Sequence, residues 1–260
     1  MSITTEQVKA LRDKTGVSVM QCKKALEEAD GNMEKAILIL KQKSTDIAAK
    51  KSDREAKDGL IVVKKNGNNI SKAVALMLNC ETDFVAKNSD FISLANSLAE
   101  IALSEGADTM RKKAPEMISP VVQKIGENIQ LGEVKEITGD ILGDYVHGGK
   151  LAVIITLSGG TEELARDIAM HTAAMKPEFI SMDEITPETR ESLKSIFQKE
   201  VDESGKPEEI KKKMLEGKIA TYLKERVLTE QAFIKNGDVT IGKLLAQARA
   251  KVTSWYTVRI

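Results

Sequence analysis

Apolar residues in the first 41 positions recur three and four residues apart, which is the spacing of helices with one buried face. Thr4 with Gln7, and Ser18 with Gln21, have the spacing of a capping box, in which side chains bond to the free amides at a helix start. A third helical pattern begins after Asn32. We therefore predict three short helices that share one small core. The next stretch, 41–58, carries ten charges in eighteen residues and predicts a linker.

A strand pattern follows the predicted linker. Residues 60–63 and 73–78 are apolar runs that predict two strands, and Asn66-Gly67-Asn68-Asn69 predicts the hairpin turn between them. Helical spacing returns after Ser89 and predicts a long helix with one buried face, formed by Phe91, Leu94, Ala95, Leu98, Ile101 and Ala102. A second helix is expected around 120–129 on the same sheet.

A similar order of elements returns in the second half of the chain. Residues 133–137 and 141–147 predict strands, and Gly148-Gly149 predicts a two-residue hairpin turn. The returning stretch 150–157 is nearly all apolar, and a helical pattern covers 161–175. We interpret the two halves as similar subdomains, each with a hairpin, a buried strand, a corner and a helix.

The last third of the chain is rich in charge. Two amphipathic patterns between 186 and 226 are separated by Ser204-Gly205-Lys206-Pro207, and Pro187 suits the first position of a helix. About half of this stretch is charged, so we expect an antiparallel coiled-coil hairpin that projects into solvent. A helix at 240–250 and a strand at 252–258 complete the prediction.

Together these patterns predict an α+β protein with antiparallel sheets covered by helices. We expect a three-helix module, of the ubiquitin-associated-like kind, in residues 1–53. A first core subdomain is predicted in 54–140 and a second in 141–260, the latter carrying the coiled-coil hairpin at about 186–226.

The charge balance excludes one broad class of partner. Lys and Arg number 39, as do Asp and Glu, so the chain lacks the basic footprint of a nucleic-acid-binding protein. Cys22 and Cys80 have neither a metal-ligand spacing nor a disulfide pattern, which fits a reducing cytosol. The first residues form no secretion signal, and no apolar run approaches the length of a membrane span. We expect a cytoplasmic protein with no metal, no cofactor, no membrane contact and no direct contact with nucleic acid.

A short polar segment stands where the first buried strand gives way to a helix. This corner, Asn79-Cys80-Glu81-Thr82-Asp83-Phe84-Val85-Ala86, places an acid beside a large aromatic residue. Such corners can hold a side chain out from a rigid scaffold. In one interpretation Phe84 tucks under the next helix and Asp83 caps that helix. In the other, the two side chains project toward a partner.

Familiar catalytic motifs are absent from the sequence. There is no GxxxxGK[ST] loop, so the protein is not itself a GTPase, and no HExxH or strand-linked GxGxxG. A thiol hydrolase built on Cys80 with His147 or His171 is one alternative, although a cysteine at the end of a buried strand is usually a small apolar residue. We expect His171 to be structural. His147 lies at a hairpin tip, as a solvated turn residue or as a partner contact.

Three strings resemble those of one family, bacterial elongation factor Ts, the exchange factor for elongation factor Tu. The corner at 79–86 is similar to its signature. Residues 11–26 resemble its amino-terminal signature, with Val19 where the family often has Met, and 228–235 resembles a third string, with Ala232 where Pro is usual. The resemblance covers essentially the whole chain in order. The family usually continues with a small helical module, whereas this sequence ends at Ile260, so this version either lacks the module or is cut short there.

The resemblance implies a guanine-nucleotide exchange factor that binds elongation factor Tu in its GDP-bound and nucleotide-free forms. Asp83 and Phe84, flanked by Thr82 and Val85, would insert near the magnesium and phosphate site and promote GDP release. Such a protein is not an enzyme in the bond-making sense.

Further contacts are implied in two other places. Arg12, Val19 and Met20 would bind a helix of the nucleotide domain, and His147 and Ile234 would hold another domain of elongation factor Tu. Neighbouring apolar residues cannot share one helix face, so at least one of Val19 and Met20 should be partly exposed. The alternative function is a protein-binding adaptor without exchange activity.

Overall fold

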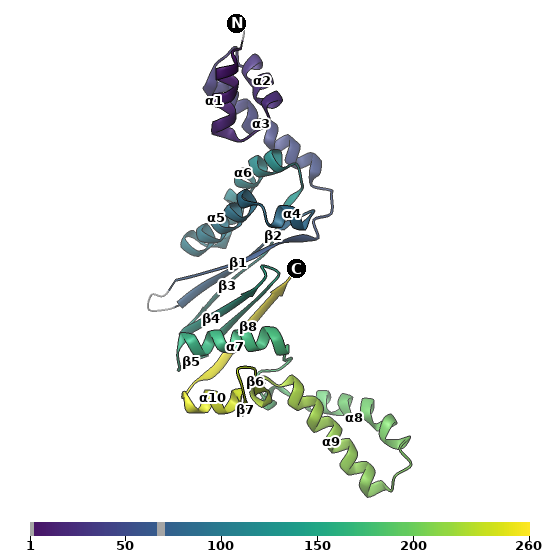
Figure 1. The fold of residues 1–260 in the computed structure, drawn as a ribbon. Coiled ribbons are helices and arrows are strands. Elements are labelled where there is room, and N and C mark those ends of the chain that lie inside the picture. The colour runs from purple at the N-terminus through teal and green to yellow at the C-terminus, as the bar shows by residue number, and fades with distance from the viewer. Residues whose placement is uncertain (1–2, 67–70) are drawn as a thin grey trace.

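The computed structural model describes residues 3–66 and 71–260. Helices cover the outer faces of two antiparallel sheets that pack against each other (Figure 1). A helical module lies at one end of the molecule and a helical hairpin projects at the other. This mixture of helices and antiparallel sheets confirms the predicted α+β class. The boundaries of the three predicted domains remain a prediction.

The amino-terminal module contains α1 (Thr5–Thr15), α2 (Val19–Glu28) and α3 (Met33–Lys51). The predicted capping box is present, because the Gln7 amide donates to Thr4 and the Gln7 side chain accepts from the Thr4 amide. Ser18 and Asn32 cap the other two helices through their side chains. One small core holds the helices together, formed by Leu11, Val17, Cys22, Ala25, Leu26, Ala29, Ala36 and Leu40.

The predicted linker at 41–58 is wrong over most of its length, because α3 continues as one helix to Lys51. Ser44 is buried, and Ile47 and Ala48 pack against the core of the first sheet, so apolar contacts recur at helical spacing within the charged stretch. The many charged residues lie mainly on the outer side of this helix and obscured its periodicity. The module is therefore joined to the rest of the protein by a packed helix.

The first sheet contains β1 (Asp58–Asn66), β2 (Ser71–Cys80) and β3 (Ile129–Gly139) in that spatial order. Two helices cover one face, α5 (Ser89–Glu105) and α6 (Ala107–Ile125). The predicted helix from Ser89 is confirmed. The second predicted helix is also present on this sheet, but its bounds of 120–129 are wrong: it begins at Ala107 and ends before Gly126, whose φ of 90° is left-handed. Positions 67–69 of the predicted turn lie outside the described residues.

The second sheet contains β4 (Ile141–His147), β5 (Leu151–Ser158) and β8 (Lys251–Arg259). The predicted hairpin turn is confirmed, since Gly148 and Gly149 have positive φ values of 57° and 70°. The helices α7 (Glu162–Met175) and α10 (Ile241–Gln247) cover the outer face. Gly143 lets α7 approach closely, because a Cβ atom there would lie 2.2 Å from the backbone of Ala165.

The central strands β2 and β5 are buried on both faces, which explains their nearly continuous apolar sequences. In β2, Val74, Leu76 and Leu78 pack under α5 and α6, while Ala73, Ala75 and Met77 face the other sheet. In β5, Ile155 faces α7 and Ile154 faces the first sheet. The molecule is thus layered as helices, sheet, sheet and helices.

Apart from a short helical turn after β2, the remaining elements are the 3-10 turns η1 (Met182–Glu184) and η2 (Leu228–Glu230), the helices α8 (Pro187–Asp202) and α9 (Glu208–Arg226), and the short strands β6 (Ala232–Phe233) and β7 (Asn236–Thr240). The α8–α9 hairpin projects from the body, as predicted (Figure 1). Leu193, Phe197, Tyr222 and Leu223 contribute to a cluster that holds its base together. Within the described residues, no helix has both the length and the apolar character needed to cross a membrane.

Candidate partner-binding site

The corner after β2 forms a single helical turn, α4 (Asp83–Ala86). Thr82 caps this turn by accepting a hydrogen bond from the Val85 amide at 3.4 Å. Val85 and Ala86 are buried against the first core, with 8% and 6% of their surface exposed. Phe84 points away from that core and is 81% exposed. The interpretation in which Phe84 tucks under the next helix is therefore wrong.

Asp83 does not cap the following helix, because Asn88 does so by accepting from the Asp90 amide at 2.9 Å. The Asp83 carboxylate instead pairs with Lys87 one turn later, at 2.8 Å. Both side chains are more than half exposed, so the pair is weak and can open at little cost. The corner thus presents an aromatic ring and an available carboxylate side by side.

Glu127, a residue that the sequence did not single out, ties this corner to the turn between α6 and β3. Its carboxylate accepts from the amides of Glu81 and Thr82, at 3.1 and 3.0 Å, and from the Thr82 hydroxyl at 2.7 Å. In return, the Glu81 carboxylate accepts from the Asn128 amide at 2.6 Å. In the sequence, Glu127 is marked only as an acid directly after the helix-ending Gly126. That position does not indicate which segment its carboxylate would bind.

The hairpin turn of His147 lies beside the corner. Asp83, Ala86 and Lys87 share the lining of a cavity of about 250 Å³ with Gly148, Gly149 and Lys150. His147 itself is exposed, and its Nδ1 atom is 3.1 Å from the Tyr145 hydroxyl. The β1 strand fixes the turn, because the Ile61 amide donates to the Gly149 carbonyl at 2.7 Å. Two segments that were predicted as separate contacts therefore flank one hollow.

The other predicted contacts lie elsewhere in the fold. Arg12 is on α1 and is exposed, and Val19 and Met20 begin α2 with 49% and 63% of their surface exposed. The expectation that at least one of these two apolar residues is partly exposed is confirmed. Neither residue belongs to the core of the module, so both are available to a partner.

Ile234 is 40% exposed and lies beyond α7, away from the corner. Its amide donates to Nδ1 of His171 at 3.3 Å, while Nε2 of the same imidazole lies 2.9 Å from Oε1 of Gln231. The expectation of a structural His171 is confirmed by these bonds and by its complete burial. Burial lowers the pKa of His171, so the neutral ring holds the Ile234 segment.

Cys80 shows no sign of an activated nucleophile. Burial raises the pKa of its thiol to about 11, so it is protonated at neutral pH. The thiol donates to the Thr82 carbonyl at 3.1 Å, while His147 and His171 bond to other residues. The thiol helps to hold the corner in place, which weakens the hydrolase interpretation.

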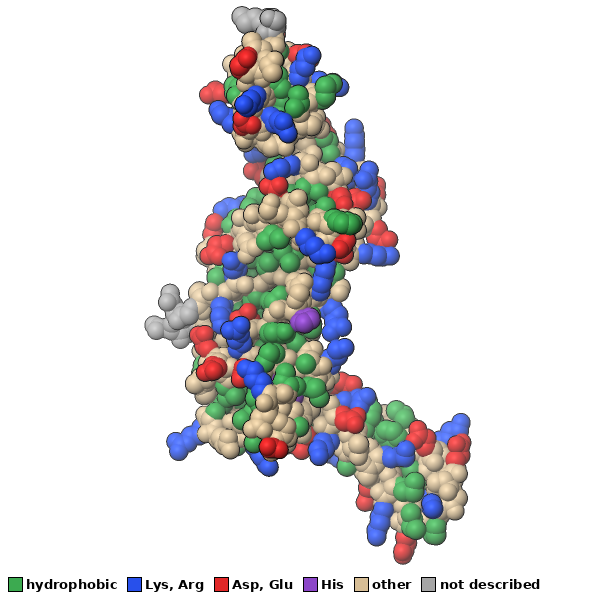
Figure 2. Space-filling view, viewed as in Figure 1, with side chains coloured by type: hydrophobic (Ala, Val, Ile, Leu, Met, Phe, Trp, Pro, Cys, Tyr) green, Lys and Arg blue, Asp and Glu red, His purple; other side chains and the backbone are tan. Residues whose placement is uncertain are grey.

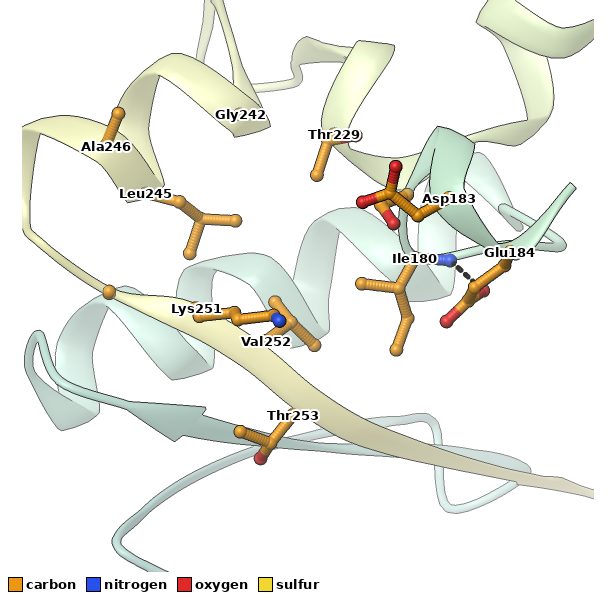
Figure 3. A pocket seen from close by; sticks show the side chains of 12 residues that line it. Ile180, Asp183, Glu184, Thr229, Gly242, Leu245, Ala246, Lys251, Val252 and Thr253 are labelled. Atoms are coloured by element: carbon orange, nitrogen blue, oxygen red, sulfur yellow. Dashed lines mark hydrogen bonds between the residues drawn. The ribbon is translucent and has the colours of Figure 1, made fainter.

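A larger cavity, of about 660 Å³, lies between η1, η2, α10 and the start of β8 (Figure 3). Leu245 and Val252 form part of its wall, while Asp183 and Lys251 supply charge. Glu184 bends back to accept from the Ile180 amide at 2.7 Å. None of the predicted site residues lines this cavity.

The surface chemistry agrees with the sequence composition. Positive and negative side chains are interspersed over the face in Figure 2, without a continuous basic stripe. Several large apolar side chains are nevertheless exposed, with Phe84 the most exposed among them. Aromatic side chains are enriched in protein–protein interfaces, so an exposed one on an anchored turn is a candidate contact with a partner.

Comparison with known proteins places the chain in a family. The family model described as Elongation factor TS matches residues 81–260, which begin at this corner. The chain belongs to the elongation factor Ts family. Elongation factor Ts of Hahella chejuensis is 42% identical over 258 residues, covering 97% of this chain and 90% of that protein. The Alkalilimnicola ehrlichii and Alcanivorax borkumensis proteins are 40% and 41% identical, over 97% and 95% of this chain and 90% of each of theirs.

Membership of the elongation factor Ts family supports a role in translation elongation. The matched region contains the corner from Glu81 onward, the His147 turn and the Ile234 segment, whereas Arg12, Val19 and Met20 lie before it. The three relatives nevertheless align over 95–97% of the chain, which takes in the amino-terminal module.

Proposed function

We propose that this elongation factor Ts family member is a guanine-nucleotide exchange factor that binds GDP-bound elongation factor Tu and promotes GDP release. The observation that carries the proposal is Phe84, 81% exposed on a turn that Thr82 caps and Val85 anchors. Burying this ring in a partner would remove apolar surface from water without disturbing the fold of the factor itself. Asp83 brings a charge to the same place.

The proposed mechanism acts on the contacts that hold the nucleotide. A GTPase grips GDP chiefly through backbone amides and a lysine at the phosphates, together with Mg²⁺. Phe84 would wedge between structural elements beside that site, and Asp83 would disturb the charge and water network of the phosphates. By linkage, a factor that weakens the binding of GDP to elongation factor Tu has its own binding weakened by GDP to the same extent, so exchange is reversible.

The wedge requires a supporting grip. We assign this role to Arg12, Val19 and Met20 in the amino-terminal module, and to His147 and Ile234 in the second half. Val19 and Met20 are exposed apolar residues at the start of one helix, which suits docking against a partner helix. The His147 turn borders the same cavity as Asp83, so a partner that reaches the corner would also meet the turn.

Release of a fluorescent GDP analogue from elongation factor Tu tests the proposal. The factor should accelerate release strongly, in proportion to its concentration until binding saturates. The competing function is an adaptor that binds through the same exposed residues without exchange activity. Binding without any acceleration would favour the adaptor and refute the exchange mechanism.

A further inference from the structure

Glu127 is the residue through which the rest of the protein holds the exposed corner. Two backbone amides and one hydroxyl of the corner converge on this single half-buried carboxylate, at 2.7 to 3.1 Å. Hydrogen bonds to an ionised acceptor are roughly twice as strong as neutral ones. Glu127 therefore fixes the backbone of Glu81 and Thr82 immediately before α4.

This arrangement also sets the direction of the Thr82 hydroxyl. Its hydrogen points to Glu127, which leaves an oxygen lone pair free to accept from the Val85 amide. That bond caps a helix of only four residues, and one isolated helical turn is not stable by itself. A chain of contacts thus runs from Glu127 through Thr82 to the turn that carries Phe84.

A bond between Glu81 and Asn128 also runs in the other direction, from the corner to the turn that carries Glu127, so each turn depends on the other. Glu81 accepts from the Asn128 amide at 2.6 Å, and the Asn128 side chain donates to the Arg54 carbonyl at 2.6 Å. The turn that supplies Glu127 is therefore itself held by hydrogen bonds to two other segments. None of these hydrogen bonds buries apolar surface. Their main effect is therefore to fix the geometry of the two turns, and they add little to the packing of the core.

We infer that Glu127 is a positioning residue for nucleotide exchange, one that keeps Phe84 and Asp83 in the orientation that reaches the partner. The inference rests on the proposed function. Without Glu127 the corner samples other conformations, and only the fraction in the productive one can act. Other contacts still bind the partner, so the maximal rate of GDP release should fall about tenfold while the half-saturating concentration changes less than about threefold.

The test compares Glu127→Ala, Glu127→Gln and a matched control, Glu136→Ala, on the intact chain. Glu136 also accepts from a backbone amide, that of Ala107 at 2.6 Å, but at the distant start of α6. The glutamine variant can still accept from both amides through its oxygen and donate to the Thr82 hydroxyl, so it should retain most of the maximal rate. Glu136→Ala should match the unmodified protein in both kinetic parameters.

Amide hydrogen exchange of Glu81, Thr82 and Val85 supplies a readout that does not depend on elongation factor Tu. Glu127→Ala should raise exchange at these amides by at least tenfold, whereas Glu136→Ala should leave them unchanged. Unaltered protection in Glu127→Ala would overturn the inference, as would a full maximal rate of GDP release. If the unmodified protein itself fails to accelerate release, the proposed function fails, and the amide protection alone decides whether Glu127 positions the corner.

Discussion

Replacing Phe84 by alanine tests whether this side chain is a partner contact or part of the core. An aromatic side chain buries about 150–250 Å² when fully enclosed, and Phe84 is 81% exposed. The area lost is therefore about 30–50 Å², or about 1 kcal/mol at 25 cal/mol per Å². Alanine has the higher helix propensity, which offsets about half of that loss. We expect Phe84→Ala to change the free energy of unfolding by less than about 1 kcal/mol.

The exchange reaction should respond much more strongly. Truncating a central aromatic contact typically costs about 2 kcal/mol or more, which corresponds to at least ~30-fold in catalysed GDP release. Asp83→Ala should also slow catalysed GDP release. It should leave the fold intact, since within the factor it breaks only the exposed pair with Lys87. The double variant should lose less than the sum of the two single losses, because both side chains act on one site.

Urea unfolding and stopped-flow release of labelled GDP, measured on the same samples, decide the matter. Phe91→Ala is the matched control, since Phe91 is fully buried and its truncation should cost about 3–5 kcal/mol of stability. A Phe84→Ala protein with a large loss of stability and full activity in its folded fraction would refute the wedge. Full stability together with full activity would refute it equally.

Three further predictions concern other parts of the chain. Replacing 186–226 by a short loop should preserve cooperative unfolding and most exchange activity, because the hairpin projects from the body; loss of cooperativity in thermal melts would contradict this. Removing 1–53 should weaken binding to elongation factor Tu, measured by calorimetry, and also lower the melting temperature, since the end of α3 packs on the core; unchanged affinity would exclude Arg12 as a contact. Lowering the pH from about 7.5 to 5.5 should destabilise the fold, because burial lowers the pKa of His171 below its unfolded value of about 6.5, so protons bind preferentially to the unfolded chain. The urea midpoint should fall less in His171→Gln, and an equal fall would assign the effect to other groups.

Periodicity predicted most of the fold because burial and spacing agree locally. The run from Phe91 to Ala102 has one helix face and buries it, and the adjacent glycines at 148 and 149 adopt the left-handed turn that their sequence favours. The exposure of Val19 and Met20 also followed from geometry, since neighbouring positions on a helix face different directions.

The errors arose where tertiary contacts override local pattern. The charged stretch after Lys41 was assigned to a linker, but contacts with the first core recur along it at helical spacing and extend the helix. The helix before Gly126 begins earlier than predicted and includes Pro115 and Pro120, which local rules disfavour inside helices. Glu127 could not be assigned a role from sequence, because its partners lie some 45 residues away along the chain.

The arrangement of the corner suits the proposed role of a factor that binds its partner and then dissociates from it. In the proposed mechanism, Phe84 gains buried area only in the complex, so its contact energy is available to offset the disruption of the phosphate site. That energy would be lost to ordering if the corner were mobile, and the bonds through Glu127 remove much of this entropic cost beforehand. The exposed pair of Asp83 with Lys87 has the opposite character, since it opens easily and frees the carboxylate. In the proposed mechanism, a rigid backbone with loosely held side chains therefore concentrates the binding energy on the step that weakens GDP binding, and nucleotide rebinding can reverse that step by the same linkage.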